Sequence, residues 1–232
     1  MPRKEQIRNM FDGIAPSYDS LNHLMSLGVD KGWRRQAVKA VVDGSAQKIL
    51  DVACGTGDLT VALAAASAKG STIVGTDISE GMMALVGQKA AKEGVISKIS
   101  LKTADGEALP FADGEFDAVT CAFGIRNFEH KEKGLQEFLR VLRPGGKLAI
   151  LELSVPDRRF VRGLYDIYFL HVLPLIGGAV SGEKSAYRYL PASVHSFPSP
   201  GEFGGMIRSA GFSRVEVKSL SMGLCRLYTA VR

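Results

Sequence analysis

Apolar segments that read as strands alternate with helical segments through the middle of the chain, and this rhythm constrains the fold more than any other feature. The predicted strands are 48–53, 71–77, 99–105, 116–124 and 147–153, and the predicted helices are 58–68, 79–94 and 132–142. Strands and helices that alternate at this spacing form βαβ units, in which the strands run parallel and helices cover both faces of the sheet. The chain is therefore predicted to have an α/β fold.

The two ends of the chain add to this unit. In residues 1–45 apolar positions recur at helical spacing, and this region is predicted to form an N-terminal helical cap. The segments 213–220 and 224–232 are predicted to close the sheet as an antiparallel hairpin, with Gly223 in its turn. Together these elements predict a Rossmann-like, mostly parallel seven-stranded sheet with helices on both faces.

Length and composition agree with one domain over residues 1–232. Hydrophobic residues make up 46% of the chain and charged residues 23%, which is ordinary globular usage and excludes a disordered chain or a coiled coil. Residues 156–205 break the alternation and are predicted to form an insertion on the substrate side. The longest uncharged apolar stretch, 167–182, has 16 residues. A spanning helix needs about 20 residues, so a transmembrane segment is not expected.

Cysteines and histidines indicate neither a disulfide framework nor a metal site. Cys54, Cys121 and Cys225 form no CxxC pair, and the four histidines lie far apart in the sequence. The odd thiol count favours a reducing, cytoplasmic location. The net charge of +5 is too diffuse to indicate a nucleic-acid partner.

The turn after the first predicted strand reads DVACGTGD and is suited to a cationic ligand. Gly55 and Gly57 allow a ligand to approach the backbone between a strand and a helix N-terminus. Thr60 stands where a dinucleotide-binding turn has its third glycine. Asp51 and Asp58 place carboxylates on both sides of the turn, which disfavours a pyrophosphate.

Acids also stand at the ends of the next two predicted strands. Asp77 lies 20 residues after Gly57, where an acid can accept both ribose hydroxyls. Asp105 can accept from an adenine amino group, while the backbone N–H beside it, at Gly106, meets a ring nitrogen. Open α/β sheets bind ligands at the carboxyl ends of their strands. A nucleoside with a cationic tail fits this edge best, so S-adenosylmethionine is the predicted cofactor.

Five ordered segments carry a resemblance to a known family. They are YDSLNHLMSLGVDKGW (18–33), LDVACGTGDLT (50–60), FGIRN (123–127), RVLRPGGKLAILELS (140–154) and SAYRYL (185–190). Together they are similar to the UbiE-type C-methyltransferases of ubiquinone and menaquinone biosynthesis, a class I methyltransferase family, over almost the whole chain. The sequence departs from that pattern at Leu21, where the family usually has Met, and at Asp30 and Tyr228, where it usually has His.

The resemblance implies the class I fold, methyl transfer from S-adenosylmethionine and a set of cofactor-binding positions. It maps Thr56, Asp77, Asp105, Gly106 and Ala122 onto that set, and Ala122 has only backbone groups to offer. Asp51, Gly55 and Gly57 complete the predicted cofactor site.

The predicted acceptor is a prenylated quinol, whose ring carbon becomes nucleophilic when a neighbouring hydroxyl ionises. A phenolic hydroxyl has a pKa of about 10, so ionisation needs a base or a nearby positive group. Arg126 and Asn127 follow the fourth predicted strand and are the predicted catalytic pair, with Arg126 stabilising the phenolate and Asn127 orienting it. The alternative for Arg126 is a surface ion pair. Candidate substrate residues are Tyr18, Tyr187 and Tyr189, which packing explains equally well. His171 is a further candidate that could relay a proton, although a half-buried histidine with its hydrogen bonds satisfied is the favoured interpretation.

Three functions remain open from the residues. The preferred one is C-methylation of demethylmenaquinol, with 2-methoxy-6-polyprenyl-1,4-benzoquinol as the close alternative substrate. The second keeps the cofactor site and changes the acceptor to another small molecule or a nucleic acid. The Pro-Cys pair and the NPPY-like motif of methyltransferases that act on such acceptors are absent. A nucleic-acid partner is therefore not expected. The third is a non-enzymatic scaffold subunit, which has no need of an intact cofactor turn.

A prenylated substrate implies contact with the inner face of a membrane. The segment 156–182 is predicted to form an apolar lid over the prenyl tail, and Arg158, Arg159 and Arg162 are predicted to touch anionic headgroups. The alternative is ordinary core packing with a solvated charged face. The oligomeric state, including a homodimer, is left open by the sequence.

Overall fold

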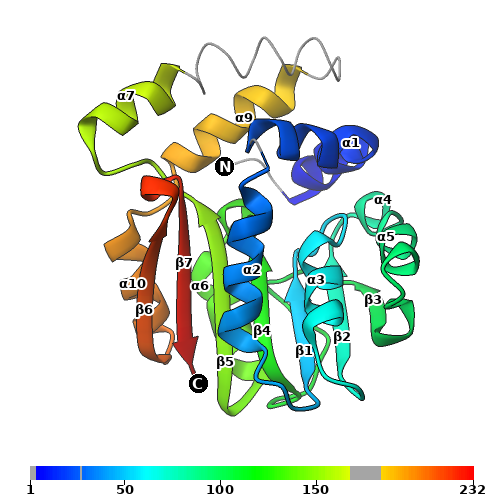
Figure 1. Ribbon diagram of the computed structural model, residues 1–232. Helices are drawn as coiled ribbons and strands as arrows, with labels where there is room; N and C mark the ends of the chain where they lie inside the picture. The colour runs from blue at the N-terminus through cyan, green and yellow to red at the C-terminus, as the bar shows by residue number, and fades with distance from the viewer. Residues whose placement is uncertain (1–3, 27, 168–183) are drawn as a thin grey trace.

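The computed structural model describes residues 4–26, 28–167 and 184–232, and a seven-stranded sheet forms its centre (Figure 1). The strands are β1 (Lys48–Val52), β2 (Thr72–Asp77), β3 (Ile99–Thr103), β4 (Phe116–Ala122), β5 (Leu142–Leu153), β6 (Ser213–Leu220) and β7 (Cys225–Val231). Their order across the sheet is β3-β2-β1-β4-β5-β7-β6.

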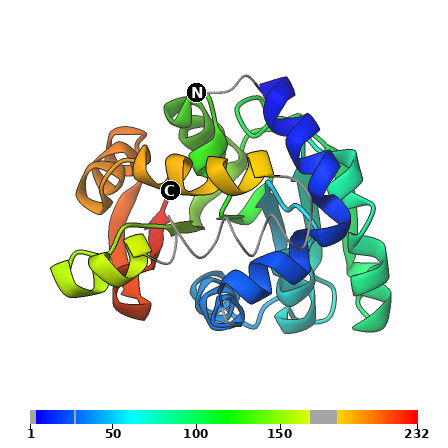
Figure 2. The same ribbon diagram turned by 90° about the horizontal axis from the view of Figure 1, so that it is seen from above.

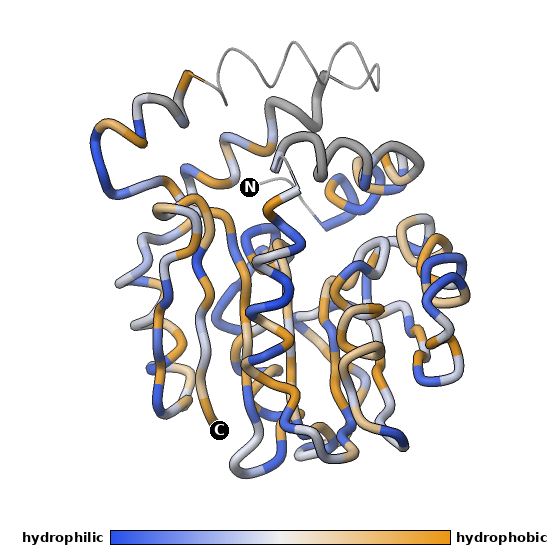
Figure 3. The backbone as a smooth tube through the Cα atoms, viewed as in Figure 1, coloured by the Kyte–Doolittle hydropathy of each residue, from blue (hydrophilic) through white to orange (hydrophobic). Residues whose placement is uncertain are grey.

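Six strands run in one direction and β7 runs against them. β1 pairs parallel with β2 and β4, β3 pairs parallel with β2, and β5 pairs parallel with β4. β7 pairs antiparallel with β5 on one side and β6 on the other. The central strands are buried on both faces, which is why they read as continuous apolar runs (Figure 3). The predicted sheet and its C-terminal hairpin are therefore confirmed.

Helices cover both faces of the sheet. The α-helices are α1 (Lys4–Met25), α2 (Asp30–Val41), α3 (Asp58–Ala66), α4 (Glu80–Met83), α5 (Val86–Lys92), α6 (Lys131–Val141), α7 (Arg159–Ile167), α9 (Lys184–His195) and α10 (Pro200–Ser209). Short 3₁₀ helices are η1 (Ile96–Lys98), η2 (Ile125–Asn127) and η4 (Ser221–Gly223). One core cluster holds side chains of α6 and α10, and the other holds side chains of α2, α3 and α5.

Helices α1, α7 and α9 lie beyond one end of the strands, whereas α2, α3, α6 and α10 flank the sheet (Figures 1 and 2). The strand ends that meet them are the carboxyl ends, because the pocket described below is lined by α1 and by the residues that follow β1, β2, β3 and β4. Helix α7 follows β5 on the same side of the molecule. Apart from Ile167, the apolar stretch 167–182 lies outside the described residues. Among the helices that the structure describes, none is long and apolar enough to cross a membrane.

Most predicted strands and helices of the middle of the chain agree with the structure to within two residues at each end, and two elements differ by more. The segment predicted as one helix over 79–94 contains two helices, because Leu85 N–H donates to the Met82 carbonyl in a tighter turn between them. Strand β5 begins at Leu142, earlier than predicted. The segment 143–146 bulges, since the pairing of Phe116 with Leu142 is followed by that of Ala118 with Lys147.

The start of α10 is stabilised by a capping box. Ser199 Oγ accepts from the Glu202 backbone N–H at 3.4 Å, and the Glu202 carboxylate accepts from the Ser199 N–H at 2.9 Å. We expect Ser199→Ala to lower the free energy of unfolding by about 1 kcal/mol in urea titrations. The matched control is Ser209→Ala at the exposed last turn of the same helix, which should change it by less than about 0.5 kcal/mol. Equal effects of the two variants would contradict a stabilising cap.

Candidate functional site

A pocket opens at the carboxyl ends of four parallel strands, beneath α1. It brings together residues that follow β1, β2, β3 and β4, and it is closed from above by side chains of α1. Seven of the residues that the sequence singled out line it: Tyr18, Gly55, Asp77, Asp105, Gly106, Ala122 and Asn127. Its position is the one that open α/β sheets use for ligands.

Asp77 forms a fixed carboxylate in the pocket wall. Its Oδ2 accepts from the Gly55 backbone N–H at 2.8 Å, and its Oδ1 accepts from the Ser79 backbone N–H at 2.9 Å. Burial raises the pKa of Asp77, while these backbone hydrogen bonds act in the opposite direction. A carboxylate has about four lone-pair sites, so two remain for a ligand. Asp77 therefore presents an oriented hydrogen-bond acceptor to the pocket.

Asp105 is bound by the first residue of α1. Lys4 Nζ donates to Asp105 Oδ2 at 2.7 Å and lies 3.0 Å from Glu107 Oε2. Glu107 also lines the pocket, and its Oε1 accepts from the backbone N–H groups of Glu129 and His130. The sequence analysis missed Glu107, although an acid two residues after Asp105 was a visible signal.

Glycine at position 106 allows close packing in the pocket wall. A Cβ on Gly106 would lie 2.4 Å from Phe128 Cζ, and one on Gly134 would lie 2.5 Å from Phe128 Cδ2. The Phe128 ring, which lines the pocket, therefore has glycine on two sides. Gly124 is similar, since a Cβ there would lie 2.4 Å from Ala53 Cβ. Gly124 belongs to the FGIRN segment noted in the sequence, but its packing on Ala53 was not predicted. Nothing in the local sequence pattern pointed to Phe128, because its packing joins distant segments.

The two glycines in the turn after β1, Gly55 and Gly57, have different structural roles. Gly55 lies in the pocket wall with a φ of 54° and donates its N–H to Asp77. Gly57 has a φ of 85°, and a Cβ there would lie 2.7 Å from Val86 Cγ1. Gly57 thus lets α3 start close to α5, and it is not among the residues that line the pocket.

Asp51 is buried behind the pocket wall. Its Oδ2 accepts from Thr60 Oγ1 at 2.6 Å, and its Oδ1 accepts from Thr120 Oγ1 at 2.8 Å. Burial raises the pKa of Asp51 to about 6. Thr60, which replaces the third glycine of a dinucleotide-binding turn, therefore serves to hold this acid.

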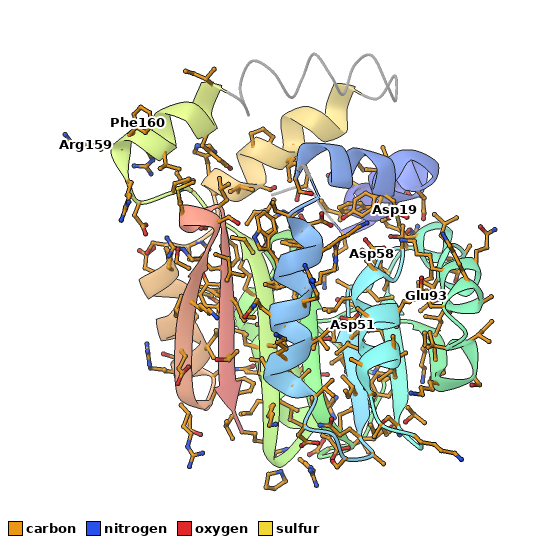
Figure 4. The ribbon with its side chains drawn as sticks, viewed as in Figure 1. Asp19, Asp51, Asp58, Glu93, Arg159 and Phe160 are labelled. Atoms are coloured by element: carbon orange, nitrogen blue, oxygen red, sulfur yellow. The ribbon has the colours of Figure 1, made fainter. Side chains whose placement is uncertain are left out.

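Thr56 also points away from the pocket, into a charged cluster that joins α1 to the turn (Figure 4). Its Oγ1 donates to Asp19 Oδ1 at 2.5 Å and accepts from Lys89 Nζ at 2.9 Å. Lys89 Nζ also lies 2.6 Å from Asp19 and 2.5 Å from Asp58. These contacts hold the second half of α1 over the turn that follows β1. Lys4, the first residue of α1, holds the start of the helix over the pocket through Asp105.

The two predicted catalytic residues lie on η2 and face different surroundings. Asn127 lines the pocket, and its Oδ1 accepts from the Tyr189 hydroxyl of α9 at 2.9 Å. Arg126 is 6% exposed and pairs with Glu152 at 2.9 Å. Its Nη1 also donates to the Phe123 carbonyl. The interpretation of Arg126 as a surface ion-pair residue is therefore wrong, since this ion pair is buried.

The predicted substrate residues are only partly described. Tyr18 lines the pocket and packs edge-to-face on Phe11, with ring centroids 5.9 Å apart. Tyr189 is half-buried beside η2. Tyr187 belongs to α9, but its side chain is outside the described part of the chain, and His171 lies outside the described residues altogether.

Comparison with known proteins identifies the family. Residues 2–232 match the family described as the ubiE/COQ5 methyltransferase family. The chain belongs to the ubiE/COQ5 methyltransferase family. The match includes both the strand ends of the pocket and the helices that cover them.

Members of this family are close in sequence. A demethylmenaquinone methyltransferase from Bacteroides fragilis is 47% identical over 230 residues, which are 99% of this chain and 94% of the relative. The ubiquinone/menaquinone biosynthesis C-methyltransferase UbiE of Geobacter sulfurreducens is 47% identical, over 97% of this chain and 88% of the relative. The chain therefore spans nearly the full length of these ubiE/COQ5 relatives.

Solved structures of lower identity share the fold. The cyclase SpnF matches with a TM-score of 0.75 at 17% identity, covering 100% of this chain and 97% of that one. A SAM-dependent methyltransferase from Aquifex aeolicus matches with a TM-score of 0.61 at 20% identity, covering 85% and 88%. The class I fold expected of a ubiE/COQ5 member is thus confirmed.

No metal-binding cluster occurs in the part of the chain that the structure describes. No group of three or more His, Cys, Asp or Glu side chains there is arranged to hold an ion.

Asp51 predicts an unusual pH dependence of stability. Its folded-state pKa of about 6 lies above the ordinary value of 3.8, so its contribution is greatest at low pH and is lost as pH rises through about 6. The stability of wild type relative to Asp51→Asn should fall by about 2 kcal/mol between about pH 4 and about pH 6.5. Chemical denaturation at intervals across this range measures it.

A second carboxyl group serves as the control for that trend. Asp43 accepts hydrogen bonds from Ser45, which lower its pKa, so the stability of wild type relative to Asp43→Asn should not fall with rising pH. The free energy of unfolding of wild type could instead differ from that of Asp51→Asn by the same amount from pH 4 to 6.5. This result would contradict a raised pKa of Asp51 in the folded state.

Proposed function

We propose that this chain transfers the methyl group of S-adenosylmethionine to a ring carbon of demethylmenaquinol. The observation that carries the proposal is the pocket at the strand ends, with Asp77 and Asp105 in its wall, in a chain that belongs to a methyltransferase family. Relatives named for demethylmenaquinone and for ubiquinone/menaquinone biosynthesis support the acceptor class. The second candidate substrate is 2-methoxy-6-polyprenyl-1,4-benzoquinol, because the second name covers both quinones.

The residues of the pocket fit S-adenosylmethionine. Asp77 has unused lone pairs for the ribose hydroxyls, and Asp105 is an acceptor for the adenine amino group. The carboxylates disfavour a phosphate-bearing ligand and suit a cation. When bound, this cofactor supplies a methyl group on a positively charged sulfur, open to in-line attack. The chain is proposed to supply the orientation from a rigid wall, in which Gly106 packs against Phe128 and Gly124 packs against Ala53.

Arg126 and Asn127 are proposed to act on the acceptor. The ring carbon attacks after a neighbouring hydroxyl has lost its proton, and a positive charge nearby favours the ionised oxygen. Arg126 supplies that charge from behind the pocket wall. Asn127 faces the pocket and is held by Tyr189, so its amide is oriented toward a ring oxygen. Tyr18 lies on the same side and is proposed to close over the substrate.

A radiolabel assay tests the acceptor. Purified protein with methyl-labelled S-adenosylmethionine and short-chain demethylmenaquinol should yield label on a ring carbon, and a parallel reaction with the benzoquinol measures the second substrate. Asp77→Asn should weaken cofactor binding about tenfold or more in calorimetry, because the charge is lost and one of the two acceptor oxygens is replaced by an NH2 donor. Asp113→Asn, at a side chain 77% exposed, is the control and should bind as wild type does. Cofactor binding without label on either quinol refutes the proposal.

We further propose that α7 contacts the surface of an anionic membrane to collect the lipid substrate. Phe160 is 79% exposed, and Arg158, Arg159 and Arg162 are exposed beside it (Figure 4). Tyr165 of the same helix is buried, so α7 turns an apolar side inward and a basic, aromatic side outward. Basic residues near an anionic surface are attracted by about 1 kcal/mol each, and an exposed aromatic ring adds apolar contact.

Flotation with vesicles tests the contact. Replacing Arg158, Arg159 and Arg162 by Glu should abolish flotation with vesicles that contain phosphatidylglycerol, and raising the salt concentration should weaken flotation of wild type. The control replaces three exposed lysines on other helices by Glu, which changes the net charge equally: Lys39, Lys92 and Lys133. Equal loss in both triple variants, or unchanged flotation of the α7 variant, contradicts a docking role for α7.

A further inference from the structure

Glu152, near the end of β5, is a fully buried carboxylate. Its Oε2 accepts from the Arg126 backbone N–H at 3.2 Å. Its Oε1 accepts from Arg126 Nη1 at 2.9 Å and from the Leu153 backbone N–H at 2.9 Å. A buried ion pair is weak evidence for stability, because desolvation offsets much of the attraction. The pair of Glu152 with Arg126 therefore calls for an explanation beyond stability.

The geometry of the guanidinium group indicates what the pair leaves available. Nη1 of Arg126 donates to Glu152 and to the Phe123 carbonyl. The Nε–H points along the opposite edge, beside Nη2, and that edge can donate two parallel hydrogen bonds to an anionic oxygen group. Nε of Arg126 is buried and has no hydrogen-bond partner among the described residues. Glu152 thus occupies one side of the group and leaves the edge with Nε unused.

The pair lies beside the acceptor side of the pocket. Asn127 follows Arg126 in η2 and lines the pocket, and the Tyr189 hydroxyl of α9 donates to it. The charge of Arg126 interacts with Tyr18 of α1 and with Tyr189, the two aromatic hydroxyls that cover this side. The Arg126–Glu152 pair therefore lies directly behind the side of the pocket that Tyr18 and Asn127 line.

Other titratable groups also face the carboxylate of Glu152. They are Cys121 of β4, Lys131 of α6, and Cys225 and Tyr228 of β7. Burial raises the pKa values of both thiols and of the Tyr228 phenol, so these groups are uncharged near neutral pH. Lys131 is a cation, and burial lowers its pKa. Arg226 of β7, the cross-strand partner of Glu152, is a second cation near it and forms an ion pair with Asp157.

We infer that Glu152 is a positioning residue for methyl transfer: it holds Arg126 through Nη1 and so fixes the guanidinium charge, with its Nε edge unused, behind Asn127 on the side where the ring oxygen of the acceptor is bound. The inference rests on the proposed function for its substrate class. Glu152 also sets the net charge near that oxygen, because its carboxylate balances the guanidinium at 2.9 Å.

Two substitutions separate the effect of Glu152 on the position of Arg126 from its effect on the local net charge. Glu152→Gln removes the negative charge and replaces one of the two acceptor oxygens by an NH2 donor, which weakens the hold on Arg126. Transfer therefore slows, while a phenol bound at the site ionises at lower pH. Glu152→Asp keeps the charge and draws it back by one methylene, so transfer slows while the ionisation midpoint stays near that of wild type. A purely structural role would not move the midpoint, and this distinguishes the inference from loss of packing.

The first measurement does not need methyl transfer. A nitronaphthol, whose anion absorbs visible light, is bound to the full-length protein and titrated with pH. We expect the midpoint in Glu152→Gln to lie about one pH unit below that in wild type, and the midpoint in Glu152→Asp to stay within about 0.3 units. The control is Glu137→Gln, which breaks the ion pair with Arg140 on α6 and should leave the midpoint unchanged. Failure of wild type to bind the probe, or equal midpoints in wild type and Glu152→Gln, overturns the inference.

The second measurement is the rate of quinol methylation. Glu152→Gln should lower kcat about tenfold or more with an unchanged affinity for S-adenosylmethionine, while Glu137→Gln stays within about twofold of wild type. If Glu152→Gln does not fold, Glu152→Asp decides: a kcat equal to that of wild type overturns the inference. A third outcome separates the two proposals. If the probe ionises as expected but wild type methylates no quinol, the proposed function is refuted and the effect of Glu152 on the charge at the site still holds.

Discussion

Parallel pairing of β1 with both β2 and β4 is the constraint on which the rest of this structure depends. The chain moves from β1 outward to β2 and β3, and then returns to place β4 and β5 on the other side. The loops that follow β1 and β4 therefore diverge, and a crevice forms where the strand order reverses. Asp77 closes one side of that crevice by accepting the Gly55 N–H, so the turns after β1 and β2 are held as one surface.

A pocket rimmed with acids needs compensation, and this protein provides it in two ways. Lys4 bridges Asp105 and Glu107 from the start of α1, so the covering helix brings a positive charge to the rim. Within the described residues Asp51 forms no ion pair, and the hydroxyls of Thr60 and Thr120 donate to its two oxygens. Burial therefore raises its pKa to about 6. The electrostatic balance of the site thus depends on a helix that lies outside the sheet.

Sequence patterns predicted the sheet, its hairpin and the strand-end acids, because periodicity and turn residues act over short distances. They could not predict contacts between distant segments. Lys4 meets Asp105 across 101 residues, and Phe128 packs on glycines from two other segments. The sequence also could not predict that Asp51 lies behind the pocket wall, because only the tertiary packing shows which way its side chain points. Arg126 was recognised as a candidate, whereas its partner Glu152 was not, because it lies on the next strand of the sheet.

The site divides into two parts of different origin. The cofactor side is built from the ends of the strands, and the acceptor side receives Tyr18 and Tyr189 from helices α1 and α9, which lie over the sheet. Solved structures below 25% identity still share the overall architecture with this chain. Strand ends are constrained by pairing on both sides, whereas a covering helix is constrained on one face only. The covering helices are therefore the place where an ancestor of this fold could acquire a new acceptor without rebuilding the sheet.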